Sequence, residues 1–177
     1  LLRLALEFKV KLDRLKLLDG ESADRQEIIV TSVEFLLAEY LTPQVGKCAR
    51  DFPQIDISLI GADRRLSLAY GQAHLALRLG RPTEGNLVAS KIAEIPFGCW
   101  VPQGKPDVRD WVGLPEELDW TPEMELGYKV FGRPPRYRVS SFDALQKAAV
   151  SCDFGAVGPC IVMCREGLLV PRPETEH

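Results

Sequence analysis

Two pairs of hydroxyl residues stand where a strand-like run of the sequence gives way to a helix-like run. The first pair is Thr31 and Ser32, and the second is Ser140 and Ser141. The first turn of a helix presents unpaired backbone N–H groups, which can bind an anion together with side-chain hydroxyls. The same residue types are also ordinary helix N-caps, so a binding role and a purely structural role stay open for both pairs.

Two arginines lie at the end of a further strand-like run, residues 73–79. Arg78 is late in that run and Arg81 is in the loop that follows it. A guanidinium group suits a carboxylate because it can donate two parallel hydrogen bonds, although an arginine in a loop is also commonly solvated. The sequence therefore indicates one set of residues for a small, anionic ligand: Thr31, Ser32, Arg78, Arg81, Ser140 and Ser141.

The cysteines and histidines give little support to metal or cofactor chemistry. The five cysteines are odd in number and irregularly spaced, and no C-x-x-C pair occurs among them. Cys160 and Cys164 stand four residues apart, but nothing obvious completes a tetrahedral zinc site in a sequence with two histidines. We therefore expect no metal, no cofactor and cysteines that are ordinary buried thiols.

A thiol-based redox role is an alternative. Cys152 and Cys160 are the pair that a reversible disulfide would use, but a reactive thiolate needs basic neighbours, and Asp153 adjoins Cys152. Motifs of common enzymes are missing as well, since the sequence contains no G-x-S-x-G, H-E-x-x-H, P-loop or G-x-G-x-x-G pattern. A binding protein without catalytic activity is the stronger expectation.

The composition is that of a globular chain. Its 177 residues, 46% of them hydrophobic, allow one domain with a substantial core or two small lobes that share a hinge. The net charge is -3, with acidic and basic residues intermixed, so no basic face for nucleic acid stands out. No apolar run approaches the roughly 20 residues that span a bilayer, and the N-terminal residues carry too many charges for a signal peptide. We expect a soluble, cytoplasmic protein without a membrane partner.

Strand-like and helix-like runs alternate in the first half of the chain. Strands are expected at residues 27–31, 56–60 and 73–79, with helices between them. This alternation predicts right-handed βαβ units and a mostly parallel sheet. Because such sheets bind ligands at the carboxyl ends of their strands, the hydroxyls and arginines of this half are expected at one edge.

Two helices are expected between these strands. The first begins at Thr31, which has capping-box spacing with Glu34, and contains Pro43, which either kinks it or starts a second helix. The second is a short helix that Asp63 caps and that ends at Tyr70.

The second half of the chain predicts a smaller α/β lobe. Residues 87–101 hold two apolar stretches, expected as strands, whereas residues 103–136 show no clean period. Ser140 and Asp143 repeat the capping-box spacing. Trp100, Trp111 and Trp120 are expected in the core, with a pocket or an oligomer contact as the alternative. The other expected elements are strands at 136–141, 155–163 and 168–170 and a helix at 144–151.

The N-terminal segment predicts a helix over residues 1–18, followed by a polar linker at 19–26. Leucines and a phenylalanine recur along one side of this helix with heptad spacing, which suits a partner helix. Packing of the same stripe on its own domain is the alternative.

Several of these runs resemble, in order, the effector-binding domain of LysR-type transcriptional regulators. The stretch 28–45, IIVTSVEFLLAEYLTPQV, looks like the family's first strand and helix, and 52–57, FPQIDI, resembles its entry into the second strand. The strongest match is 72–82, QAHLALRLGRP, where the family usually reads Gly-x-x-Asp-Leu-Ala-Leu-Arg. The runs at 87–98 and 139–155 are similar to strands and a helix that follow.

The resemblance implies a type 2 periplasmic-binding-protein-like fold: two α/β lobes, with mixed sheets flanked by helices, preceded by a linker helix. It implies lobes that close on a small effector, a homodimer or homotetramer, and DNA contact only through an N-terminal winged helix-turn-helix domain that this sequence does not contain. A solute-binding protein of the same fold is an alternative. The expected organisation is a linker helix and linker at 1–26, lobe I at 27–97, lobe II at 98–165 and a truncated C-terminal return segment at 166–177.

Two residues depart from the family pattern. His74 stands where the family prefers aspartate, and Asp153 stands where a glycine is usual. We therefore expect unusual hydrogen bonding beside His74 in lobe I and an altered turn beside Asp153 in lobe II.

Overall fold

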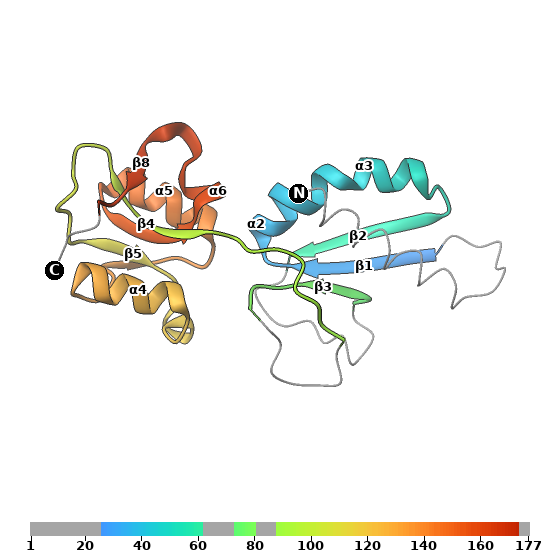
Figure 1. Cartoon of the computed structure of the whole chain (residues 1–177), viewed down its shortest axis with the longest axis horizontal. Coiled ribbons are helices and arrows are strands. Elements are labelled where there is room, and N and C mark those ends of the chain that lie inside the picture. Colours follow the sequence, from blue (N-terminus) through green and yellow to red (C-terminus); the bar gives the residue numbers. More distant parts are fainter. Residues whose placement is uncertain (1–25, 62–72, 81–87, 174–177) are drawn as a thin grey trace. The chain divides into compact units, whose positions relative to one another are not determined.

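The computed structural model divides the chain into two compact units, unit 1 at Leu1–Glu94 and unit 2 at Ile95–His177. Each unit has its own sheet and its own hydrophobic core (Figure 1). The structure describes residues 26–61, 73–80 and 88–173. The expected N-terminal helix and linker, and the helix expected between Asp63 and Tyr70, lie outside the described residues.

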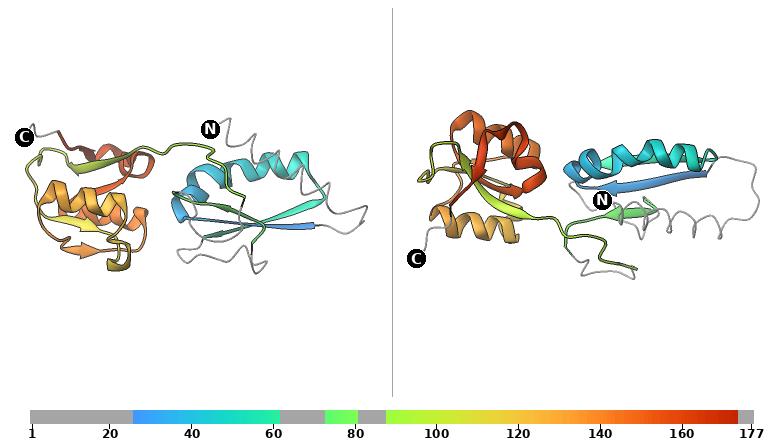
Figure 2. Two further views of the ribbon diagram at one scale, coloured as in Figure 1. Left: turned by 60° about the horizontal axis from the view of Figure 1, so that its bottom comes forward. Right: turned by 45° about the horizontal axis from the view of Figure 1, so that its top comes forward.

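Unit 1 is built on a parallel sheet of three strands in the order β2-β1-β3. A helical run connects β1 to β2 and lies over one face of this sheet (Figures 1 and 2). The parallel sheet predicted from the sequence is thus confirmed for these strands. The elements of unit 1 are β1 Gln26–Ser32, α2 Glu34–Leu36, η1 Leu37–Leu41, α3 Thr42–Asp51, β2 Ile55–Gly61 and β3 Leu75–Leu77.

The helical run between β1 and β2 changes its geometry where the sequence places a proline. Pro43 has no N–H group to donate to the carbonyl of Glu39, four residues earlier, and its ring crowds that carbonyl. The turn that precedes it, η1, is a π-helix. Pro43 then occupies one of the first positions of α3, where proline is tolerated. Of the two outcomes expected for Pro43, a kink or the start of a second helix, the structure therefore shows the second.

The core of unit 1 lies between β1 and this helical run. Ile28 and Val30 of β1 are each 1% exposed, as expected for the central strand of a covered parallel sheet. Leu37 and Leu41 are one helical turn apart and pack against them. The buried members of the cluster are Ile28, Val30, Leu37, Leu41, Phe52 and Ile55.

Unit 2 contains a mixed sheet of five strands in the order β6-β5-β7-β4-β8. β5 pairs in parallel with β6 and β7, whereas β4 pairs antiparallel with β7 and β8. α4 lies on one side of the sheet and α5 and α6 on the other (Figure 1). The elements are β4 Phe97–Pro102, β5 Trp111–Gly113, η3 Glu116–Leu118, α4 Pro122–Phe131, β6 Tyr137–Arg138, α5 Phe142–Cys152, β7 Gly155–Pro159, α6 Cys160–Met163, η4 Arg165–Gly167 and β8 Leu169–Pro171.

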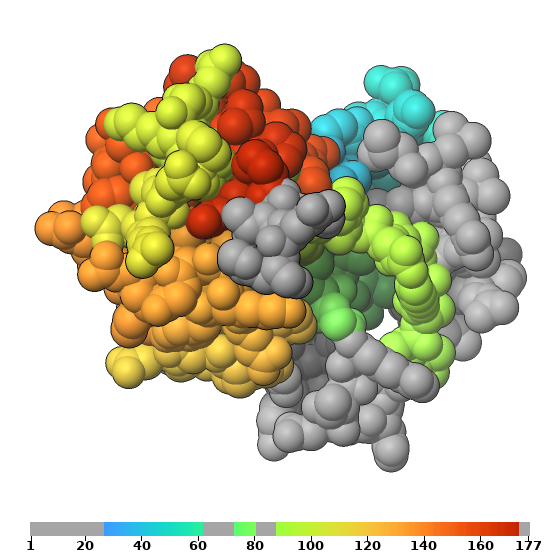
Figure 3. Space-filling view, turned by 60° about the vertical axis from the view of Figure 1, so that its left-hand side comes forward, coloured from blue at the N-terminus to red at the C-terminus, as the bar shows by residue number. Residues whose placement is uncertain are grey.

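Trp111 lies at the centre of the unit 2 core and is 1% exposed. Its ring stacks on Phe131 with the ring centroids 5.5 Å apart, and Tyr128 meets it edge-on at 5.6 Å. The indole N–H donates to the Arg133 carbonyl at 2.8 Å. Gly127 lets α4 approach this ring, because a Cβ there would overlap the six-membered ring of Trp111. The segments of unit 2 accordingly form one continuous packed body in the space-filling view (Figure 3).

The other two tryptophans differ in exposure. Trp100 is 5% exposed and donates its indole N–H to the Gly158 carbonyl at 3.3 Å. The predicted core position is therefore confirmed for Trp100 and Trp111. It was wrong for Trp120, which is 68% exposed.

Several strands are shorter than the sequence predicted. Of the two strands expected over 87–101, only β4 forms, and residues 88–96 have no regular structure. The run 155–163 is a strand only as far as Pro159, which has no N–H for the ladder, and it continues as α6. The strands expected at 73–79 and 136–141 shrink to three and two residues. Residue composition thus extends these runs beyond the backbone pairing that defines a strand.

The departure at Asp153 falls on a residue with left-handed backbone geometry. Asp153 is the C-cap of α5 with φ 57° and ψ 41°, a conformation that glycine adopts without steric cost. Its carboxylate makes an ion pair with Lys105 at 2.6 Å, and both side chains are about half exposed, so this pair contributes little to stability. The turn expected at Glu166 and Gly167 is present, and both residues have positive φ.

Candidate functional site

The predicted hydroxyl and arginine residues of unit 1 come together at one edge of its sheet. Thr31 and Ser32 are the last residues of β1, and Ser32 pairs in register with Gly61 of β2 and Leu77 of β3. Arg78 follows Leu77 directly. Because all three strands are parallel, their carboxyl ends meet at this edge, which is where sheets of this kind bind ligands.

Hydrogen bonds connect these residues across the strands. The Ser32 hydroxyl donates to the Leu77 carbonyl at 2.8 Å, and the Arg78 guanidinium donates to the Thr31 hydroxyl at 3.1 Å. Thr31 and Ser32 are both 0% exposed. The two hydroxyls therefore hold the end of β3 against β1 and orient the guanidinium of Arg78. Arg81, the remaining candidate of this unit, lies outside the described residues.

The capping role predicted for Thr31 was wrong. Both Thr31 and Ser32 belong to β1, since pairing with strands on both sides keeps their backbone extended. The N-cap is Val33, and its carbonyl accepts the N–H groups of Leu36 and Leu37 at 3.0 and 3.2 Å. Val33 has no side chain that can cap, so Glu34 begins the helix without a capping box.

His74 takes part in the pairing of β1 with the segment before β3. The N–H of Ile29 donates to His74 Nδ1 at 2.9 Å, and the N–H of His74 donates to the Ile29 carbonyl at 2.9 Å. A histidine ring nitrogen thus supplies the acceptor for a strand N–H where the family prefers a carboxylate. His74 is exposed, and its two bonds to Ile29 extend the pairing with β1 beyond the amino end of β3.

The second pair of hydroxyls lies at the corresponding edge of unit 2. Ser141 is the N-cap of α5, and its hydroxyl accepts the N–H of Ala144 at 3.2 Å. The sequence placed this cap one residue too early, at Ser140, which is exposed. Asp143 does not complete a capping box, because its carboxylate is bound by Arg165.

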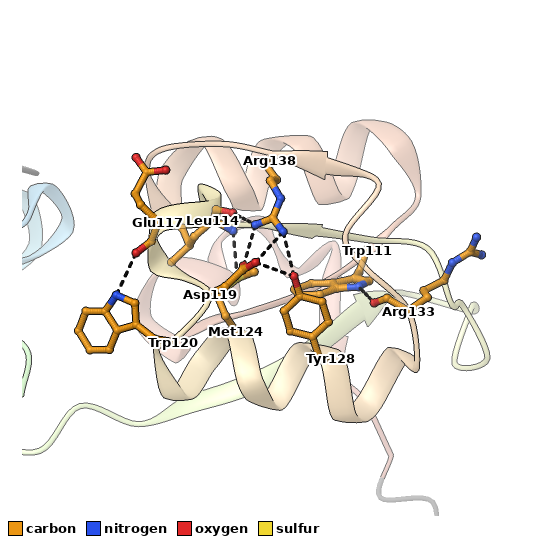
Figure 4. Close-up of polar contacts among 9 residues, drawn as sticks. All are labelled: Trp111, Leu114, Glu117, Asp119, Trp120, Met124, Tyr128, Arg133 and Arg138. Atoms are coloured by element: carbon orange, nitrogen blue, oxygen red, sulfur yellow. Dashed lines mark hydrogen bonds and ion pairs between the residues drawn. The ribbon is translucent and has the colours of Figure 1, made fainter.

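A polar cluster that the sequence did not indicate fixes the loop after β5. Arg138 donates from both terminal nitrogens to the Asp119 carboxylate, at 2.8 and 3.0 Å, and also to the Leu114 carbonyl at 2.7 Å. Tyr128 donates to Asp119 at 2.8 Å and accepts from Arg138 at 2.9 Å (Figure 4). The bond between the Leu114 N–H and Met124 Sδ at 3.2 Å adds a further attachment. We call Leu114, Asp119, Tyr128 and Arg138 the loop clamp.

Acid should release part of the loop clamp. The hydrogen bonds from Arg138, reinforced by Tyr128, hold the pKa of Asp119 below its ordinary value against a smaller opposing effect of burial. A carboxyl group with a lowered folded-state pKa stabilises the fold above its unfolded pKa of about 4, and this contribution is lost as the pH falls through the folded value. The difference in unfolding free energy between wild type and Asp119→Asn should therefore be largest near neutral pH and shrink on acidification.

Urea unfolding at neutral and acidic pH measures this difference. Glu117→Gln removes an exposed carboxylate from the same loop and is the control, since only its backbone carbonyl is bonded, to Trp120. A difference between wild type and Asp119→Asn that stays constant from neutral to acidic pH would show that the clamp does not depend on the Asp119 charge.

The cysteines are all free thiols, but the expectation that they are buried was wrong, since Cys152 and Cys164 are exposed and the other three are half-buried. Burial raises the pKa of Cys99 to about 11, although Arg172 opposes the shift, so this thiol is protonated at neutral pH. Cys152 is the last residue of α5, three residues before Gly155 begins β7, and Cys160 directly follows the last residue of β7. A five-residue strand spans about 16 Å, far beyond the Cα separation of a disulfide, so pairing of Cys152 with Cys160 requires β7 to rearrange.

Two further observations concern the described residues alone. They contain no group of three or more His, Cys, Asp or Glu side chains that is placed to hold a metal ion. None of their helices is both long enough and apolar enough to cross a membrane.

Two α/β units with polar groups at the carboxyl edges of parallel strands define a ligand-binding domain of the periplasmic-binding-protein type. The family described as LysR substrate binding domain matches residues 21–177. The chain therefore belongs to this family, whose members are the effector-sensing regulatory domains of LysR-type transcription regulators.

Proteins with a similar sequence or a similar structure agree with this assignment. The chain is 28% identical over 137 residues to the Mau operon transcriptional activator of Paracoccus denitrificans, with 72% of this chain and 48% of that protein covered. It thus spans about half the length of this curated relative. The CrgA regulatory domain of Neisseria meningitidis is 20% identical, with a TM-score of 0.66 and 84% and 81% of the two chains covered. The AmpR effector domain of Pseudomonas aeruginosa is 18% identical, with a TM-score of 0.66 and coverage of 85% and 80%.

Proposed function

We propose that this chain senses a small anionic effector and that Arg78 is its principal anion-binding group. The observation that carries the proposal is the Arg78 guanidinium, oriented by the Thr31 hydroxyl at 3.1 Å at the carboxyl edge of a parallel sheet. An oriented guanidinium loses less conformational freedom on binding a carboxylate than a mobile one and can offer parallel donors.

The proposed effector contacts include the other candidates of both units. In unit 1 these are Arg81, which follows β3 in the sequence, together with Thr31 and Ser32, whose buried hydroxyls take part by positioning Arg78 and the end of β3. In unit 2 they are the exposed Ser140 and the N-cap Ser141 at the start of α5. An anion near Ser141 would also gain from the partial positive charge of the α5 N-terminus.

We further propose that the whole protein is a transcription regulator and not an enzyme. The name of the Paracoccus relative, a transcriptional activator, supports this proposal. DNA would be bound through an N-terminal winged helix-turn-helix domain, the protein would act in the cytoplasm where its DNA is, and it would assemble as a homodimer or homotetramer. Effector binding would change the activity of the attached DNA-binding domains.

A thermal-shift screen tests the sensing role. Small carboxylates should raise the unfolding temperature saturably, because a ligand that binds only the folded state stabilises it, by about 2.7 kcal/mol at 100 times its dissociation constant. Neutral amides of the same acids should have no effect. Shifts that are equal for an acid and its amide would contradict recognition of an anion.

Arg78→Gln should weaken binding of such a carboxylate by at least about tenfold, since it removes a charged hydrogen-bond donor. Arg50→Gln is the matched control: it removes the same charge from the last turn of α3, which leads to the amino end of β2 and thus to the opposite edge of the sheet. Titration of both variants by calorimetry, with circular dichroism to verify the fold, gives the comparison. Unchanged affinity in folded Arg78→Gln would overturn the assignment.

A further inference from the structure

The exposed Trp120 is held in one orientation by its own loop. Its indole N–H donates to the Glu117 carbonyl at 2.9 Å, so the polar atom of the ring is already bonded within the loop. In Figure 4 the ring projects outward from this loop, away from the loop clamp. With an exposure of 68%, Trp120 offers a large apolar surface to solvent, whereas the other two tryptophans are core residues.

The loop that carries Trp120 is anchored at both ends. Asp119, the residue before Trp120, receives hydrogen bonds from Arg138 and Tyr128. Thr121, the residue after it, donates its N–H to the Leu118 carbonyl at 2.9 Å and leads directly into α4. A ring displayed on such a loop loses little conformational freedom when a ligand packs against it, which is the condition for efficient binding.

Trp120 also lies at the ligand-binding edge of unit 2. The loop follows β5, which pairs in parallel with β6 and β7, so it stands at the carboxyl edge of these strands. Arg138, the last residue of β6, connects the two neighbouring loops: it is bonded to Asp119 on one side and precedes Ser140 by two residues on the other. The indole ring and the candidate hydroxyls therefore belong to adjacent loops of one edge.

We infer that Trp120 is a specificity-determining contact of the effector site, and that the effector is a carboxylate with a planar aromatic group that packs on this indole. The inference rests on the proposed sensing of an anion. Aromatic pairs gain about two- to tenfold in affinity beyond the burial of their area, and a saturated ring lacks the flat face and quadrupole that produce this gain. The indole thus supplies selection by shape, while the N-terminus of α5 at Ser141, at the same edge of unit 2, favours a negative charge.

Phenylacetate and cyclohexylacetate are the probes for this inference, since they share a charge and a carbon skeleton and differ in the planarity of the ring. The protein should bind phenylacetate several-fold more tightly. Trp120→Ala should lower the ratio of the two affinities by about two- to tenfold and so remove most of the preference. Trp120→Phe should retain the preference. Binding should also quench the tryptophan emission of the wild type, and this change should be absent from Trp120→Phe although Trp100 and Trp111 remain.

The possible outcomes separate this inference from the function on which it rests. Binding of both acids with equal affinity, or a preference that survives in Trp120→Ala, would overturn the role of Trp120 and leave anion sensing intact. Binding of neither acid, alongside saturable binding of other carboxylates, would overturn the aromatic class. Binding of no carboxylate at all would contradict the proposed function and this inference together. The high exposure of Trp120 means that its variants should keep the wild-type unfolding temperature, which excludes loss of folding as an explanation.

Discussion

Replacement of Gly127 by alanine is expected to lower the free energy of unfolding of unit 2 by about 2 kcal/mol. Replacement of glycine by alanine inside a helix usually raises the free energy of unfolding by about 1 kcal/mol, so the expected change at Gly127 has the opposite sign. The reason is that a Cβ at Gly127 overlaps the ring of Trp111, and that ring is confined by Phe131 and Tyr128. Urea unfolding followed by tryptophan fluorescence reports on unit 2 alone, because the three tryptophans of the chain lie in it.

Gly46→Ala is the matched control for this experiment. Gly46 lies inside α3, where the nearest atom to an added Cβ is a guanidinium nitrogen of Arg50 at 3.9 Å. Alanine should therefore stabilise α3 by up to about 1 kcal/mol, measured by circular dichroism. In the double variant Gly127→Ala with Trp111→Phe, the smaller ring leaves room for the added Cβ. Its loss of unfolding free energy should therefore be smaller than the sum of the losses in the two single variants. Stabilisation by Gly127→Ala alone would show that α4 does not pack against Trp111 in this way.

The fold class was accessible from the sequence because unit 1 follows a strong local pattern. The β-branched run that contains Ile28 and Val30, the stop at Pro53 and the second strand alternate at lengths that permit only βαβ connections. The same alternation places the carboxyl ends of the strands at one edge, so Thr31, Ser32 and Arg78 were correctly predicted to lie together. The alternation of apolar and polar residues and the order of the strands along the chain were therefore enough to predict the sheet of unit 1 and the residues at its carboxyl edge.

The helix ends were less accessible, since the cap of a helix depends on where its preceding strand stops pairing. Thr31 and Ser141 have the same residue chemistry, yet Thr31 remains in β1 and Ser141 caps α5. The difference comes from β3, which extends the pairing of β1 through Ser32. For α4 the signals were present: Pro122 stands at the start and Gly132, with φ 68°, at the end, and they were obscured by the glycine and proline content of the region.

The loop clamp could not be predicted because its members are brought together only by the tertiary fold. Arg138 is separated from Asp119 by 19 residues and from Leu114 by 24. Nothing in the sequence distinguishes Arg138 from the arginines at 133 and 136, which pair with Asp110 instead. The exposure of Trp120 has the same origin, since composition alone favours burial of tryptophan.

Replacement of Ser32 by alanine is expected to destabilise unit 1 by about 1–3 kcal/mol, because the Leu77 carbonyl then loses its donor in a partly buried position. The loss should concentrate at β3, a strand of three residues whose end is held by this bond and by the Arg78–Thr31 contact. Hydrogen exchange of a peptide that covers residues 73–80 should therefore accelerate by about tenfold or more.

Ser58→Ala separates this effect from the general cost of removing a serine hydroxyl. The Ser58 hydroxyl donates to Glu27 at 2.6 Å in the same sheet, but this bond is exposed, so its removal should change stability by less than about 0.5 kcal/mol. Because Arg78 adjoins Leu77, Ser32→Ala should also weaken carboxylate binding, and Ser58→Ala should not. Equal exchange rates at β3 in both variants would mean that the Ser32 hydroxyl does not secure β3, and the orientation of Arg78 would then depend on Thr31 alone.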